Sequence, residues 1–468
     1  MKNHRILLIA IVFMVFISAC ATTEQEVVPD YFDGEDLSVD LNGQTLVMGM
    51  VPDYFFEGDN SVLTYTYNTD LGDLAAKRIN DIESKYNCKL RFDYVGRTGS
   101  LAFSSAVAGL YIFDFISEES FFLYNYLTTN AFQDLTQVEN LDVFDETKWG
   151  SRYMRVSTMY DGVIIGVLPA MHPMRLSNSI DEILVINEDL IGKLSATDPR
   201  DYYERGEWTW DTFEDCLLNY AITDNPDHIV YSLSAGIGRT ARSLALCNGY
   251  DFITFNDSGD FELGYFSPNA IEAYNWVFEL YNGPAGRNID TEPSLDKFVS
   301  GSAVMQYLSA YEIVSTTDSV AFRMDNFGLV PSPCGPSAKG QDDWKISYSS
   351  ADFTLAIPIT AQDVETSALI LDQIYEPFEG YETKDQVIEY LRRNYFLDVR
   401  DAEYFVEIAL GDRPFFHDNS RGFGFFSHVE DGVTKMIDSY KGPAMGAAKK
   451  NLVPAYKTIE MYEELFHD

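Results

Sequence analysis

TLVMGM at residues 45–50 and KLRFDYV at residues 89–95 are the two stretches that decide the fold class. The first is a mostly apolar run and the second alternates apolar with polar residues, so both patterns are typical of β-strands. Between them, apolar residues recur at the spacing of one helical face: Leu71, Ala75, Ile79, Ile82 and Tyr86. Strand, helix and strand in this order predict a βαβ unit with parallel strands and a right-handed crossover.

A second strand-to-helix unit is predicted further on. Residues 111–117 (YIFDFIS) have the composition of a strand, and a helix is expected from Ser120. Because ligands of open α/β sheets bind at the carboxyl ends of the strands, residues just beyond strand ends are candidate binding residues. They are Asp53, Tyr54, Glu118 and Glu119. Neighbouring side chains on a strand point in opposite directions, so a solvated strand terminus is the alternative interpretation of the two glutamates.

The composition of the chain excludes several classes of protein. Of 468 residues, 46% are hydrophobic and 14% aromatic, which is enough for a large core and excludes disorder for the bulk of the chain. The length fits two sizeable domains. With 33 Lys and Arg against 73 Asp and Glu, the net charge is −40. Binding to nucleic acid or to anionic lipid through a basic patch is therefore disfavoured.

The amino end has the pattern of an export signal. Lys2, His4 and Arg5 precede an unbroken apolar run at residues 6–17, and small residues follow up to Cys20. As a helix this run would extend about 18 Å, too short for a hydrocarbon layer of about 30 Å. We found no second apolar stretch of the roughly 18 residues that a membrane span needs.

The cysteine at the end of this signal carries a further expectation. Residues 17–20, Ile-Ser-Ala-Cys, resemble the lipobox of bacterial lipoproteins, which implies that Cys20 is acylated and anchors the chain to a membrane. An ordinary signal peptide with a chance cysteine is the alternative. Residues 21–40 contain seven acids and no Lys or Arg, so we expect a signal peptide at 1–20 and a solvated tether at 21–40.

Several segments, taken in order, resemble the extracellular solute-binding lipoproteins of ABC importers, in particular the family 1 carbohydrate-binding group. They are YDGVIIGVLP at 160–169, LVINEDL at 184–190, GEWTWDTF at 206–213, NGYDF at 248–252, FVSGSAVM at 298–305 and FGLVPSP at 327–333. Each is weak alone, and the ordered set covers most of the chain from about 45 to 360.

This resemblance implies an α/β fold of the two-lobed, type II periplasmic-binding-protein kind, with crossing strands that join lobes able to close on a ligand. The chain order of the family places the crossings near residues 169–173, 351–358 and 411–414. The first lobe would then comprise residues 40–170 and 356–410, and the second lobe residues 171–355 and 411–468.

The resemblance also implies ligand-binding positions. Tyr311 stands where the family has a Trp that stacks on the sugar, a departure that keeps an aromatic face. Arg239 and Arg242 fall at the ligand-facing edge of the second lobe, where they would suit an anionic saccharide; pairing with nearby acids is the alternative. His172 follows the first crossing as either a site residue or a filler of the hinge.

Other motifs carry weaker signals. Residues 236–241 (GIGRTA) fit G-x-G-x-x-A, but an acid-tipped strand about 20 residues further on is not evident, so a nucleotide site is disfavoured. Residues 256–260 (NDSGD) lack the order of a calcium loop and are interpreted as a turn. Neither a metal nor a cofactor is expected. Cys88, Cys216, Cys247 and Cys334 have no zinc spacing; we expect buried thiols, with a disulfide as the alternative.

The function that these observations predict is a non-enzymatic, monomeric binding protein. It would be exported, anchored by lipid to the outer face of the cytoplasmic membrane, and would pass a carbohydrate to the permease subunits of an ABC importer. A lipid-anchored glycoside hydrolase and a structural lipoprotein or adhesin are the alternatives.

Overall fold

The computed structural model describes most of the chain between residues 39 and 410. The described ranges are 39–51, 61–63, 65–66, 68–127, 129–149, 159–160, 163–172, 180–224, 228–249, 253–255, 261–264, 267–315, 318–340, 345–346 and 353–410. The predicted signal peptide, residues 21–38 of the predicted tether and residues 411–468 lie outside these ranges.

The first sheet has four strands in the order β15-β5-β1-β4. β1 (Gln44–Met50), β4 (Cys88–Tyr94) and β5 (Phe115–Glu119) are parallel, and β15 (Phe353–Ala356) pairs antiparallel with β5. α1 (Asp70–Lys85) connects β1 to β4, and α2 (Thr98–Ala108) connects β4 to β5. The predicted βαβ unit is confirmed.

The second sheet has five strands in the order β12-β9-β13-β8-β14. The strands β9 (Tyr231–Ser234), β12 (Ile289–Asp290) and β13 (Ala303–Leu308) are parallel, whereas β8 (Ile183–Asn187) runs antiparallel to β13 and to β14 (Phe327–Val330). Every residue of β8, β13 and β14 is buried, because helices cover both faces of this sheet.

The helices of the second lobe are α5 (Glu188–Leu194), α6 (Pro199–Glu204), α7 (Trp210–Asn219), α8 (Ile237–Leu246), α9 (Pro268–Asn282), α10 (Leu295–Val299), α11 (Ala310–Val314), α12 (Val320–Arg323), α14 (Lys384–Asn394) and α15 (Val399–Ala409). The first lobe adds α3 (Ser120–Leu123), α4 (Glu146–Trp149) and α13 (Val364–Ile374). The remaining described elements are β2 (Ser61–Val62), β3 (Tyr65–Thr66), β6 (Met159–Tyr160), β7 (Val163–Ile164), β10 (Ile253–Phe255), β11 (Phe261–Leu263) and the 3-10 turns η2 (Tyr124–Tyr126), η3 (Leu135–Gln137) and η7 (Ala285–Asn288).

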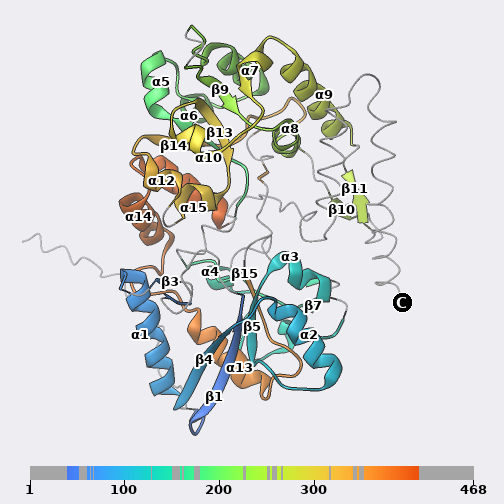
Figure 1. Cartoon of the computed structure of the whole chain (residues 1–468). Coiled ribbons are helices and arrows are strands. Elements are labelled where there is room, and N and C mark those ends of the chain that lie inside the picture. Colours follow the sequence, from blue (N-terminus) through green and yellow to red (C-terminus); the bar gives the residue numbers. More distant parts are fainter. Residues whose placement is uncertain are drawn as a thin grey trace, which may run out of the picture.

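The two sheets form two lobes that the chain joins by several crossings (Figure 1). The first crossing leaves the first lobe after Val167, which bridges to Leu355 of β15, and enters β8. The second leads from β14 back to β15, and the third leads from α13 to α14.

The third crossing corrects the expected lobe boundaries. The resemblance placed residues 356–410 in the first lobe, but α14 and α15 bury Val387, Leu391 and Phe405 in the core of the second sheet. The expected last crossing at 411–414 lies outside the described residues. An amphipathic helix shows in its sequence which face is apolar, but not which of two sheets that face will cover.

A buried ion cluster fastens α15 to the second lobe. Arg200 of α6, which is 5% exposed, donates to the carboxylates of Glu188, Asp198 and Asp401. Asp401 in turn accepts the backbone N–H of Leu329 in β14 at 2.7 Å. Burial raises the pKa of Asp401 to about 7, and the charge of Arg200 opposes that rise.

We expect that Arg200→Met lowers the free energy of unfolding by about 3–5 kcal/mol, because several buried carboxylates lose their shared cation. Urea denaturation measures this loss. Arg205→Met is the matched control: Arg205 pairs with Glu207 at an exposed site, so its loss should cost less than about 1 kcal/mol. Equal losses for the two variants would contradict the anchoring role of Arg200.

Candidate ligand-binding site between the lobes

The carboxyl ends of the parallel strands form one edge of each sheet, and these edges face each other. α3 follows β5 and α8 follows β9, and Figure 1 shows both helices on the sides of their lobes that face the opposite lobe. One buried apolar cluster includes Ile116 and Ile165 of the first lobe together with Leu244 and Val277 of the second. Ligand contact at either edge would therefore lie at the boundary between the lobes.

Glu118 at the first edge caps a helix. Its side chain is fully buried, and Oε2 accepts the backbone N–H of Gly99 at 2.8 Å and the hydroxyl of Thr98 at 3.2 Å, in the first turn of α2. Burial raises the pKa of Glu118, and these donors oppose the rise. This carboxylate satisfies the amino end of α2, where a negative charge is favourable, and is not accessible to a ligand.

Glu119 differs from its neighbour because it remains accessible. Its Oε2 accepts Nη1 of Arg97 at 2.7 Å, and the guanidinium of Arg97 lies 3.5 Å from the ring centroid of Phe122. The Arg97 side chain is 44% exposed. This strand end therefore offers a carboxylate, a guanidinium and an aromatic ring together.

At the second edge, Glu182, which precedes β8, interacts with several side chains of α8. Its buried carboxylate pairs with Arg242 and accepts the hydroxyl of Ser243 at 2.9 Å. Arg239 lies 3.7 Å from the same carboxylate and donates to the carbonyl of Tyr307 at 3.1 Å. Arg242 is 6% exposed and engaged in this pair, whereas the Arg239 side chain is 27% exposed.

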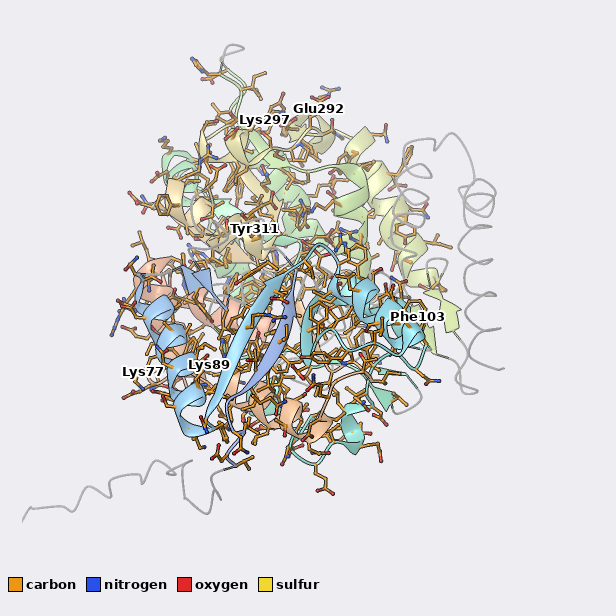
Figure 2. The ribbon with its side chains drawn as sticks, turned by 60° about the horizontal axis from the view of Figure 1, so that its bottom comes forward. Lys77, Lys89, Phe103, Glu292, Lys297 and Tyr311 are labelled. Atoms are coloured by element: carbon orange, nitrogen blue, oxygen red, sulfur yellow. The ribbon has the colours of Figure 1, made fainter. Side chains whose placement is uncertain are left out.

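Tyr311 lies in α11, three residues after the end of β13. A reciprocal pair of hydrogen bonds between Ser309 and Glu312 fixes the start of this short helix. The Tyr311 side chain is half-buried, and Figure 2 shows it where the second lobe borders the first. An aromatic ring at this place can present a face toward the boundary between the lobes.

His172 packs among aromatic rings of the hinge. It is 3% exposed, its Nδ1 lies 3.1 Å from the hydroxyl of Tyr65, and its ring contacts those of Tyr375 and Phe378 at 5.3 and 4.7 Å between centroids. The first and third crossings thus meet at this ring, which favours the hinge-filling interpretation.

The structure brings some of the predicted residues together and reveals others. Asp53, Tyr54 and Cys20 lie outside the described residues. Sequence reasoning missed Arg97. This residue follows the end of β4, so the expectation that ligands bind beyond the carboxyl ends of strands would have identified it. It also missed Glu182, since an acid in a loop before a strand carries no signal among 73 acids.

A tyrosine-lined hollow of about 770 Å³ lies where the third crossing meets the two lobes. Tyr65 and Asp70 line it from the first lobe, and Tyr390 and Tyr395 from the second. Tyr381 of the crossing packs edge-on against Tyr390, with 5.4 Å between the ring centroids. These residues are far apart in sequence, so no local pattern indicated the hollow.

Within the described ranges, neither a cluster of potential metal ligands nor a helix long and apolar enough to cross a membrane is found.

Comparison with known proteins relates the chain to others through structure. No family model and no curated protein matches the sequence. A cyclo/maltodextrin-binding protein complexed with maltotetraose is similar over 89% of this chain and 97% of its own, with a TM-score of 0.59 at 13% identity. The GacH receptor of Streptomyces glaucescens was solved unliganded and with acarbose. It is similar over 91% of this chain and 99% of its own, with a TM-score of 0.53 at 14% identity.

An ABC substrate-binding protein from Listeria monocytogenes in complex with cycloalternan covers 89% of this chain and 99% of its own, with a TM-score of 0.54 at 13% identity. Together these likenesses confirm the expected α/β, two-lobed periplasmic-binding-protein fold over about nine-tenths of the chain.

We expect Glu118→Ala to lower the free energy of unfolding by about 1–3 kcal/mol, because the N–H of Gly99 and the hydroxyl of Thr98 lose a buried acceptor. Glu119→Ala, which removes the neighbouring accessible carboxylate, should change it by less than about 1 kcal/mol. Chemical denaturation of both variants measures the difference. Unchanged stability in Glu118→Ala would contradict the capping role of Glu118 and make it a candidate ligand contact again.

Proposed function

We propose that this protein is the substrate-binding component of an ABC importer and that it captures an extracellular carbohydrate. The observation that carries the proposal is the pair of facing carboxyl edges, each with a partly exposed arginine and one with a half-buried tyrosine, in a fold shared with saccharide-bound structures. Aromatic faces pack on the apolar side of a sugar ring, and charged groups exchange hydrogen bonds with its hydroxyls.

The proposed contacts are the predicted residues that remain accessible, together with Arg97. Tyr311 and Arg239 would act from the second lobe, and Glu119 with Arg97 from the first, while Asp53 and Tyr54 stay predictions. A neutral saccharide suits this set because the accessible arginines already face carboxylates: Arg97 pairs with Glu119, and Arg239 lies near Glu182.

The proposed mechanism is a shift in population without a covalent step. A ligand that touches both edges has higher affinity for the closed arrangement of the lobes, so binding favours closure. The ring of His172 and the tyrosines near the third crossing lie where the chain must bend.

The proposed location follows from the amino-terminal sequence. Acylation at Cys20 would hold the protein on the outer face of the cytoplasmic membrane, and residues 21–40 would let the lobes reach the permease.

A thermal-shift screen against neutral and uronate-bearing saccharides tests the function. A ligand at 100 times its Kd stabilises the folded state by about 2.7 kcal/mol and raises the melting temperature. For each hit, small-angle scattering should show a smaller radius of gyration, because the lobes close. Release of a reducing-end product would instead indicate a glycoside hydrolase, and a failure of every saccharide to bind would contradict the proposal.

We expect Tyr311→Ala to weaken binding of such a saccharide by about 1–3 kcal/mol, the range for losing a well-packed aromatic contact. Calorimetry measures the change. Tyr311→Phe keeps the ring and should retain most of the affinity, so an equal loss in both variants, or none in either, would argue against stacking.

We expect Cys20→Ala to move the protein from the membrane fraction to the soluble fraction, because the acyl anchor is lost. Cys334→Ala is the control and should remain with the membranes. Immunoblots of fractionated cells measure this, and a Cys20→Ala protein that stays membrane-bound would show that the lipobox interpretation is wrong.

A further inference from the structure

We propose that Cys247 and Cys334 form a disulfide bond in the mature protein. Cys247 is the first residue after the end of α8, and Cys334 lies in the segment that follows β14. Both are reduced in this structure. The inference rests on the export proposed above, because disulfides persist in oxidising compartments.

The backbones of the two residues are held close together. The N–H of Gly335 donates to the carbonyl of Cys247 at 2.9 Å. Standard bond geometry adds about 2.4 Å on each side, so the two Cα atoms are at most about 7.7 Å apart. Disulfide-bonded cysteines have Cα separations of about 4.4–6.8 Å, so the separations that this contact allows include those that a bond requires.

Each thiol also lies near a backbone carbonyl of a residue that follows Cys334 in the chain. Sγ of Cys247 lies 3.4 Å from the carbonyl of Lys345, and Sγ of Cys334 lies 3.5 Å from the carbonyl of Gly340. Burial raises the pKa of Cys247, and a negative charge on Cys334 would raise it further, as expected for two neighbouring sulfurs.

Packing around Asn248 holds these backbones in place. Its Oδ1 accepts the N–H of Ser337 at 2.9 Å, and its amide donates to the carbonyl of Asn269 at 2.9 Å. Gly335 lies so close to Asn248 and Trp210 that a Cβ at that position would clash with both. The approach of the two cysteines is thus set by a packed core and not by a loosely placed loop.

The other two described cysteines have different surroundings. Cys216 in α7 donates to the hydroxyl of Tyr220 at 3.1 Å, and Cys88 belongs to the sheet of the other lobe. They serve as internal controls.

Oxidation can begin at Cys334. This residue is half-buried and lines a hollow of about 760 Å³ beside Trp210 and Trp276, whereas Cys247 is 2% exposed. The Cys334 thiolate attacks a small disulfide oxidant, forming a mixed disulfide and releasing one thiolate. Cys247, after losing its proton, displaces the second thiolate from that mixed disulfide. The two thiolates take up the two protons, so two thiols and one protein disulfide result.

The bond would join the end of α8 to the segment that leads from β14 toward the second crossing. It would close a long loop and so reduce the conformational entropy of the unfolded chain.

The experiment is peptide mapping by mass spectrometry of the full chain, isolated from the cell envelope and alkylated before any reduction. We expect a cross-linked peptide pair containing Cys247 and Cys334, lighter than the separate peptides by two hydrogen atoms, and alkylated Cys88 and Cys216. Reduction should lower the melting temperature of the wild type and leave that of Cys334→Ser unchanged.

A second experiment tests whether the two cysteines can pair, independently of the compartment in which the protein resides. The same chain is unfolded under reducing conditions and refolded in a glutathione redox buffer, which gives a buried thiol access to the oxidant. A bond that forms here but not in the cell would support the pairing and contradict export. Alkylation of both cysteines after refolding, or a bond to Cys88 or Cys216, would overturn the proposal.

Discussion

The three crossings between the sheets are the constraint on which the rest of the molecule depends. Because the chain passes from the first lobe to the second, returns to β15 and leaves again after α13, the parallel strands of both sheets end at the same boundary. Loops at strand ends carry side chains that the sheet does not need for its own hydrogen bonds. The crossings therefore place two sets of such loops opposite each other.

Buried charged side chains of the two lobes are paired. This pairing distinguishes charged groups with a structural role from those that a ligand can reach. Glu118 accepts a hydrogen bond from the amino end of α2, and Glu182 forms an ion pair with Arg242. Arg200 forms ion pairs with the carboxylates around α15. A buried ion is costly unless it is paired and hydrogen-bonded. In a chain with 73 acids, it is burial and partnership that separate binding candidates from helix caps and ion pairs.

Local patterns predicted the elements well and their assembly less well. The strands at 45–50 and 89–95 were recognisable because a strand's period is written into consecutive residues. The place of α14 and α15 was not, since both sheets offer an apolar surface and the choice depends on contacts such as Leu329 with Asp401, which no local pattern records. Of the candidate site, Tyr311 and Arg239 were found by resemblance, and Arg97 and Glu182 came only from the structure.

The sequence by itself determined the α/β class of the fold, the parallel pairing of the strands in its first βαβ unit and the pattern of an export signal, because each is encoded in neighbouring residues. Only the tertiary structure decided against which lobe the last described helices pack, which acidic side chains are accessible and which cysteines lie near each other. Those properties depend on pairs of residues far apart in the chain, whose distance is set by packing of the whole molecule and not by any period in the sequence.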